Sequence, residues 1–452
     1  MLNAGIVQVA TDLDRSYADI AKLNGYMLLA LGAASPFVSA IARKYGKRPI
    51  FVISSLFGLV GCLVAEFAGN YNTLVAGRLI QGLGASAYES LCTSVVNDIY
   101  FVHQRGLYVA LVVFFLSSLS NGVSVLAGII TTRLGWPYNF HILLPFVAIQ
   151  LILVALFVPE TVYVRPTTLN IDRLGWAVAV NDAKEKQSQG DHYEVTISSQ
   201  AKEQPDYNNE AAPNAEVPQP KSFWRQLALY NGTFTEKPLL SMVLASIVVM
   251  ANVIASYNIL VSGLIMAWFV AMSVLAGVMF AAPPWGYDAA AVGYVSAGPL
   301  VGGCIATVFL TLVSDPLIRS MTKRNRGVYE PEFRLILATI GGIFSVAGLV
   351  GFGHSIADQR SIYTISTIWG ITLFGMSVAA SITMGYALDS QPAHAVEIFT
   401  MNITFKNFFF YGYVNLNLYL RLYTNALAAS PTSSSSGTRP KVWPRYLMSL
   451  VA

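Results

Sequence analysis

The chain has 452 residues, of which 54% are hydrophobic and only 12% are charged. A soluble domain carries about 25% charged residues, so this chain lacks the polar surface that a soluble protein of its length needs. The net charge of +4 is small and sits between apolar runs, which argues against a nucleic-acid-binding surface. Cys62, Cys92 and Cys304 all lie inside apolar runs, which argues against a disulfide framework or a metal cluster.

Ten apolar runs approach or exceed the length of about 20 residues that crosses a bilayer. They cover 24–42, 50–69, 74–96, 107–131, 139–159, 239–280, 291–313, 334–353, 362–388 and 395–423. The run 239–280 is too long for one helix of ordinary tilt, so we expect one span and an extra segment there, and the fold of 239–262 stays open. The pattern predicts an all-α polytopic membrane protein with an N-terminal helical bundle over 1–163 and a C-terminal helical bundle over 237–424.

The two predicted bundles are separated by a polar stretch. Residues 164–236 have too few apolar side chains to form a core, so we expect a disordered cytoplasmic linker. Phe223, Trp224, Leu227 and Tyr230 repeat at helical spacing, which indicates either a short interfacial helix or plain linker. Residues 425–452 read as a low-complexity tail.

Basic residues predict the orientation, because short cytoplasmic loops are enriched in Lys and Arg. Such residues follow the first run and surround the loop after residue 313, whereas the loops near 70–73 and 281–290 carry none. With the basic loops and the linker in the cytoplasm, residue 1 lies outside, although no signal peptide precedes the first run. The stretch 2–10 resembles half a span and no span follows Tyr423, so we expect a chain truncated at both ends.

Three polar residues lie on one face of the run 74–96. An arginine inside a span costs about 2.5–3.5 kcal/mol on insertion scales, so Arg78 is expected to face a cavity or an acidic partner. Glu89 follows eleven residues later and returns almost to the face of Arg78, with Gln81 between them. The pattern favours a substrate or proton pathway; the alternative is an ion pair that only holds the bundle together.

Four further residues complete the predicted pathway. Asn121 lies on a small, polar face with Ser117, Ser124 and Gly128, which suits tight packing or a wet cavity. Asn402 and Lys406 share a face of the last run at i, i+4, and Asn407 follows directly. We expect Arg78, Gln81 and Glu89 to face Asn402 and Lys406, although Lys406 is nearly as compatible with a snorkelling lysine.

Polar residues at the ends of the runs predict gating loops. Gly46, Lys47 and Arg48 follow the first run, and glycine there permits a tight turn, whereas the two cations can anchor the loop at the anionic inner leaflet. Asp315 and Arg319 follow the run 291–313, at the matching point of the second bundle, and Asp389 follows the run 362–388. This correspondence favours a parallel internal repeat with its site at the midplane.

Several ordered motifs resemble those of Major Facilitator Superfamily transporters, specifically the fungal drug:proton antiporter-like group. Residues 78–85, RLIQGLGA, match the pattern RxxQGxGA, and residues 39–48, SAIARKYGKR, resemble GxLaDRxGRR, with Ser39 for the first glycine and Arg43 for the acidic residue. The segments 97–106, 159–165, 298–303, 314–319 and 328–334 also follow the group. The usual GPxxGG element is replaced by VSVLAG at 123–128.

The resemblance implies two helical bundles, with about ten or eleven of the usual twelve transmembrane helices, that move a small organic solute by alternating access. It further implies a monomer in the plasma membrane and coupling to protons, for which Glu89 is the expected carrier. The sequence has no GxxxxGKS loop, no metal-ligand cluster and no GxSxG motif, so we expect no enzyme, cofactor or metal. A non-transporting membrane sensor and an inactive transporter fragment are the rival hypotheses. Amphipathic drugs, polyamines and other organic cations all remain possible substrates.

Overall fold

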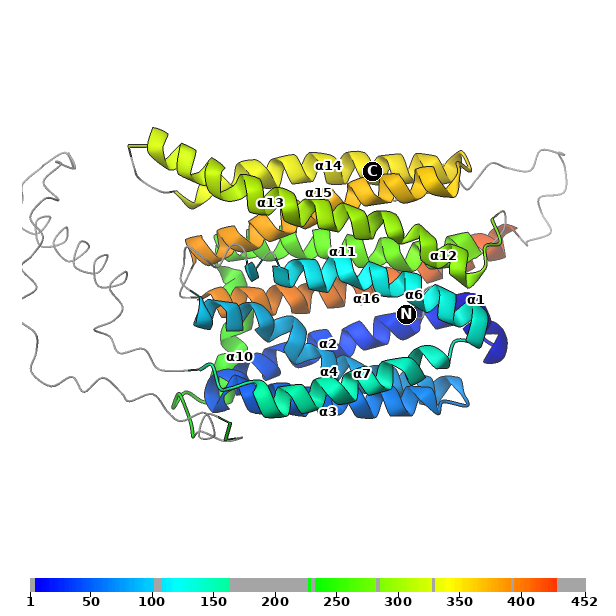
Figure 1. The fold of residues 1–452 in the computed structure, drawn as a ribbon, viewed down its shortest axis with the longest axis horizontal. Helices are drawn as coiled ribbons and strands as arrows, with labels where there is room; N and C mark the ends of the chain where they lie inside the picture. The colour runs from blue at the N-terminus through cyan, green and yellow to red at the C-terminus, as the bar shows by residue number, and fades with distance from the viewer. Residues whose placement is uncertain are drawn as a thin grey trace, which may run out of the picture. The chain divides into compact units, whose positions relative to one another are not determined.

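The structure, a computed structural model, describes residues 5–100, 108–109, 111–162, 227–228, 232–281, 285–326, 330–391 and 394–428. Most of the predicted linker, including Phe223, Trp224 and Tyr230, lies outside these residues, as does the predicted tail beyond residue 428. The described residues of Met1–Thr161 and Leu229–Ala452 form one compact unit (Figure 1).

The described part of the chain is helical and contains no strand. The first half consists of α1 (Ile6–Asp12), α2 (Tyr17–Tyr45), α3 (Lys47–Glu66), α4 (Tyr71–Ile99), the π-helical turn η1 (Phe114–Ser118), α6 (Leu119–Leu134) and α7 (Tyr138–Phe157). The second half consists of α10 (Leu239–Val248), η3 (Val249–Ala251), α11 (Val253–Ala281), α12 (Ala289–Val295), α13 (Ala297–Arg324), η4 (Pro331–Arg334), α14 (Leu335–Ala357), α15 (Ile362–Ser390) and α16 (Ala395–Ala428).

Short polar side chains define where several helices begin. Ser16, Asn70, Asp288 and Ser361 each accept a hydrogen bond from the backbone N–H three residues later, at the start of α2, α4, α12 and α15. Such a cap satisfies one of the free N–H groups of the first helical turn.

Each predicted apolar run forms a helix, and the described residues contain eight helices that are long and apolar enough to cross a membrane. Helices α4 and α16 are long enough but fall outside that set, and they carry the candidate pathway residues from Arg78 to Glu89 and from Asn402 to Asn407. The open segment 239–262 forms the short helix α10, the turn η3 and the beginning of α11. One long helix and one extra apolar segment therefore occupy the run 239–280.

Residues predicted to lie in gating loops lie in helices at three places, and one of them is Asp389 in the last turn of α15. Helix α13 continues through Pro316 to Arg324, so Asp315 and Arg319 lie in a helix and not in a gating loop. Likewise α2 and α3 are separated by Gly46 alone, and Lys47 and Arg48 form the first turn of α3. Hydropathy marks where a helix leaves lipid, whereas its backbone hydrogen bonds continue into water, so the helices end beyond the apolar runs.

Glycines allow the helices of each half to approach closely. In the first half α4 packs on α2 and α3, and a Cβ built on Gly82 or Gly84 would overlap the backbone of those neighbours. In the second half α15 packs on α13 and α14, where Gly341 and Gly375 lie at the contact. The two halves meet mainly along α2 with α16 and along α6 with α12.

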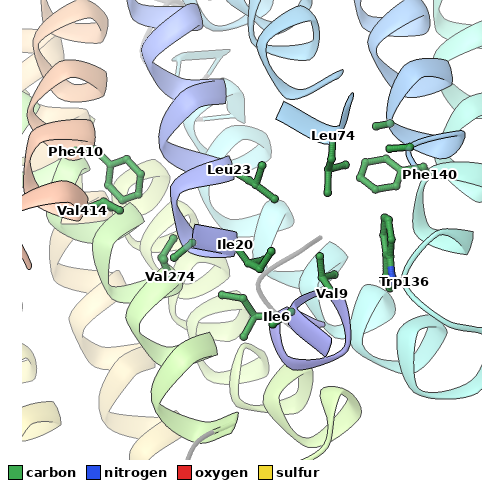
Figure 2. Close-up of a cluster of buried hydrophobic side chains, with 14 of the residues drawn as sticks. Ile6, Val9, Ile20, Leu23, Leu74, Trp136, Phe140, Val274, Phe410 and Val414 are labelled. Carbon is green, nitrogen blue, oxygen red and sulfur yellow. The ribbon is translucent and has the colours of Figure 1, made fainter. Parts of the chain in front are cut away.

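We call the end of the bundle at which α2 ends and α3 begins the Gly46 end. A hydrophobic cluster fills the opposite end, where Ile6 and Val9 of α1 meet side chains from both halves (Figure 2). The labelled members also include Ile20, Leu23, Leu74, Trp136, Phe140, Val274, Phe410 and Val414. This cluster joins α2 and α4 to α11 and α16.

Candidate functional site

An ion pair between Glu89 of α4 and Lys406 of α16 joins the first half to the second. The Nζ atom of Lys406 donates to Oε1 of Glu89, and the two side chains are only 11% and 22% exposed for Lys406 and Glu89, respectively. Both are far from the helix ends, so each charge depends on the other for compensation. Removing one partner of a buried pair leaves an uncompensated charge, which is strongly unfavourable.

Arg78 and Gln81 face the interior of the first half instead of this ion pair. Nη1 of Arg78 donates to Oε1 of Gln81 over 2.9 Å, and the guanidinium lies 5.0 Å from the ring centroid of Phe140. Nε2 of Gln81 in turn donates to Sγ of Cys62 over 3.4 Å. Eleven residues separate Arg78 from Glu89, which places them about 16 Å apart along a helix axis and against different neighbours. The two therefore share a face but form no common contact.

The three candidate asparagines occupy separate places. Asn402 donates through Nδ2 to Oγ of Ser262 on α11, within the second half. Asn407 is completely buried, and its Cβ packs where Gly32 of α2 has no side chain. Asn121 is buried on α6, which packs against α12 and α13. Of the predicted second-half residues, Lys406 contacts a predicted residue of the first half, Glu89, through an ion pair.

At the Gly46 end, Lys47 and Arg48 are buried, with 4% and 3% exposure, so the expectation that they anchor a loop at the lipid surface is wrong. Nζ of Lys47 forms an ion pair with Asp98 at the end of α4 and donates to Oγ of Ser94 over 2.7 Å. Nη2 of Arg48 donates to the carbonyl of Ala155 over 2.7 Å. Their partners come from α4 and α7 and compensate the cations inside the protein.

The second half repeats this arrangement at the corresponding place. Nε of Arg334, just before α14, donates to Oδ2 of Asp389 at the end of α15 over 2.7 Å. In both halves a cation at the start of one helix thus pairs with an aspartate at the end of the next. Arg319, in contrast, is exposed on α13.

A further ion pair between the halves lies outside the predicted pathway. Arg43, in the last turn of α2, forms an ion pair with Glu397 in the first turn of α16. Its Nη2 atom also donates to the carbonyl of Met242 in α10 over 3.3 Å. The only available signal was Arg43 itself, which stands where the related motif has an acidic residue.

A small pocket of about 10 Å³, which has room for about one water molecule, lies between the halves. Ser124 of α6 lines it from the first half, and Ser273, Ser296 and Trp369 line it from the second. One turn further along α6, a Cβ on Gly128 would overlap the backbone of Ala289. The small, polar face of α6 thus borders a cavity at one level and packs tightly at the next. Among the described residues no group of His, Cys, Asp and Glu could hold a metal ion.

Comparison with known proteins agrees with this architecture. The sequence model of the Major Facilitator Superfamily matches residues 1–408. An uncharacterized MFS-type transporter of Schizosaccharomyces pombe is 22% identical over 424 residues, which cover 90% of this chain and 72% of that protein. The MFS-type transporter ppz2 of Metarhizium majus is 29% identical over 174 residues, 38% of this chain. That match spans only 29% of ppz2, and the match to the efflux pump MMF1 of Mycosarcoma maydis spans 25% of that pump.

Solved transporter structures share the fold at low sequence identity. The proton:xylose symporter XylE of E. coli superposes with a TM-score of 0.55 at 13% identity, over 95% of this chain and 86% of XylE. The human organic anion transporter MFSD10 gives a TM-score of 0.50 at 13% identity, over 90% of this chain and 81% of that one. At such identity the likeness concerns the fold alone. The apolar helices make the chain an integral, multi-pass membrane protein, and the family match over nearly its whole described length shows that it belongs to the Major Facilitator Superfamily.

Proposed function

We propose that the chain is a secondary active transporter that moves a small organic solute by alternating access, coupled to protons. The single observation that carries this proposal is the buried ion pair between Glu89 and Lys406. It joins α4 of the first half to α16 of the second, so the pair has to break or exchange partners whenever the halves move apart. A ligand can drive such a change only by binding one arrangement better than the other.

Protonation of Glu89 supplies that difference. The neutral carboxylic acid no longer attracts the ammonium of Lys406, so one proton weakens the contact between the halves. An organic cation that approaches Glu89, or an anionic group that approaches Lys406, competes for the same partners. Proton binding and solute binding are thereby coupled through two side chains.

The motifs at 78–85 and 39–48 support placement in the fungal drug:proton antiporter-like group. Relatives named as efflux pumps support export as the direction of transport. The substrate class that we propose is amphipathic drugs or other organic cations. We further propose a monomer in the plasma membrane, with the Gly46 end in the cytoplasm because of the basic residues that surround it.

The test begins with a growth screen of cells that express the chain against a panel of drugs and polyamines. The purified chain is then reconstituted in liposomes, and uptake of the selected compound is measured with and without a pH gradient. We expect Glu89→Gln to abolish gradient-driven accumulation while leaving exchange across the membrane. Glu66→Gln is the matched control, because Glu66 pairs with the exposed His141 at the other end of the bundle.

Undiminished pH-driven flux in Glu89→Gln would refute the assigned role of Glu89. Binding of the selected compound without net flux in the unmodified chain would instead favour a membrane sensor on the same scaffold.

A further inference from the structure

Helix α10 lies across the other helices at the Gly46 end. It runs crosswise to their axes (green in Figure 1) and packs on both α2 and α16. With ten residues it is too short to span a bilayer, although it is strongly apolar. It therefore bridges one helix of each half at the place where these two helices end and begin.

Its inner face is held by apolar packing. Met242 and Val243 are buried against Ala40 of α2. In the following turn, Val249 packs with Ile398 of α16. The backbone adds a further link, because the N–H of Phe234 donates to the carbonyl of Lys44 at the end of α2 over 2.9 Å. This segment consequently contacts both halves.

The outer face of α10 is apolar and exposed. Leu240 is 67% exposed, and Leu244, Ile247 and Val248 are 48%, 50% and 66% exposed. A helix with one face packed on protein and an apolar face turned outward suits the boundary between lipid and water. The outer face of α10 is therefore suited to contact lipid at this boundary.

Beneath α10 lies the ion pair between Arg43 and Glu397, with side chains 23% and 12% exposed. Arg43 is at the C-terminal end of α2 and Glu397 at the N-terminal end of α16, so each charge is favourable for its own helix dipole. The guanidinium also holds the carbonyl of Met242, which ties the ion pair to the overlying helix. Arg43 of α2 thus contacts both α16 and α10.

We propose that α10 is a strap, and the pair Arg43–Glu397 its latch, which together hold the cytoplasmic gate closed between α2 and α16. Opening toward the cytoplasm requires the latch to break and α10 to release one of the two helices. The proposal rests on the alternating access proposed above, but it concerns a gate that is distinct from the proton carrier Glu89. It also gives Arg43 a role in a chain whose motif departs from the acidic residue of the group.

A cysteine at Thr400 reports on this gate. Thr400 is completely buried on α16, one turn beyond Glu397 and one turn before Thr404, whose hydroxyl donates to the carbonyl of Gly32 on α2. We therefore expect a reagent from the Gly46 end to reach it only when α2 and α16 separate at the latch. Thr400→Cys is introduced into the full chain after Cys62, Cys92 and Cys304 are replaced by alanine. The rate of its reaction with a water-soluble maleimide is then measured on the purified protein in detergent.

Reversing either charge of the latch places like charges together. We expect R43E and E397R each to raise the labelling rate about tenfold or more, as suits loss of a largely buried ion pair. The double reversal R43E/E397R restores slow labelling only in part, because each new charge opposes its helix dipole. Arg324→Glu, a reversal at an exposed site on α13, is the control and leaves the rate unchanged.

The strap is tested by a pair of substitutions on α10 itself. Val243→Ala removes a buried anchor and is expected to speed labelling, whereas Val248→Ala on the exposed face is not. If R43E is not monodisperse, Arg43→Gln takes its place, because it removes the attraction without adding repulsion.

The proposal is overturned if the single changes at Arg43 and Glu397 do not speed labelling, or if the double reversal labels as fast as the singles. Equal labelling rates for Val243→Ala and Val248→Ala would show that α10 does not act as a strap. Labelling does not require a transported compound, so it tests the latch independently of the role proposed for Glu89. The latch can be supported even when Glu89→Gln retains proton-driven flux, and it can be refuted even when Glu89→Gln abolishes that flux.

Discussion

The carboxylate of Glu160 lies directly against Gly46 and caps the helix that Gly46 precedes. It accepts hydrogen bonds from the backbone N–H groups of Lys47 and Arg48, over 3.0 and 3.1 Å, at the start of α3. A helix N-terminus offers free N–H donors and the positive end of the dipole, so a carboxylate is favourable there. Gly46 has φ +105°, and a Cβ on it would overlap Glu160. Glycine is thus required both by the backbone and by the cap.

Gly46→Ala is therefore expected to lose more stability than backbone strain alone explains. The positive φ costs about 1 kcal/mol or more for alanine, and displacing the cap adds about 1 kcal/mol. The control is Gly135→Ala, with φ +98° but only Cδ of Pro137 nearby, at 3.7 Å. The apparent melting temperature in detergent, followed by tryptophan fluorescence, measures both variants. Equal losses of melting temperature would show that displacing the Glu160 carboxylate does not reduce stability.

The sequence predicts the positions of the helices because apolar runs of sufficient length have few alternatives in a bilayer. It does not predict their ends. Arg319 and Lys47 look like loop residues because they are charged, yet both lie in helices that extend past the apolar run. The partners that bury Lys47, such as Asp98, are distant in sequence, and hydropathy contains no information about them.

The candidate site is predictable to the extent that a charge in an apolar run needs a partner. That argument selects Glu89 and Lys406 as residues that turn inward, and the structure places them in contact. It cannot assign pairs, because Arg78 meets the same requirement and contacts Gln81 and Phe140 instead. Which of several buried groups meet depends on the depth of each helix, and this is a property of packing.

The contribution of the Glu89–Lys406 pair to stability should be separable from its contribution to transport. We expect Glu89→Met or Lys406→Met alone to lower the free energy of unfolding by about 3 kcal/mol, because each leaves a buried charge without its partner. The double variant should recover most of that loss, since two apolar side chains of similar size replace the pair, yet it should not transport. Thermal unfolding and liposome flux of the same preparations measure the two effects.

The exposed pair Asp358–Arg360, with side chains 54% and 60% exposed, is the control for this comparison. Asp358→Asn should change stability by less than about 1 kcal/mol, as is usual for surface pairs. A double variant at Glu89 and Lys406 that is as unstable as the singles would mean that packing at these positions, and not charge, is decisive.

Gly82 sets the distance between α2 and α4. A Cβ there would overlap the carbonyl oxygen of Met27 and reach Cβ of Ala30 at 3.0 Å, so Gly82→Ala forces the helices apart. Overpacking of this kind costs about 1–3 kcal/mol. It should also move Glu89, two turns further along α4, away from Lys406. Gly342→Ala on α14, where no atom lies within 4 Å, should be neutral or stabilising when the melting temperatures are compared.

The repeated cation–aspartate pairs should differ in strength although their places in the two halves correspond. The side chain of Lys47 is 5% exposed, so Asp98→Asn leaves an ammonium that water cannot reach, and we expect a loss of about 2–3 kcal/mol. The side chain of Arg334 is 21% exposed, and its guanidinium can hydrate when Asp389→Asn removes the partner, so the loss should stay near about 1 kcal/mol. The melting temperatures of Asp98→Asn and Asp389→Asn test this prediction. Equal losses of stability would mean that burial of the cation does not determine the strength of these pairs. The difference would also identify the pair of the first half, next to the cap that Glu160 provides, as the stronger of the two contacts.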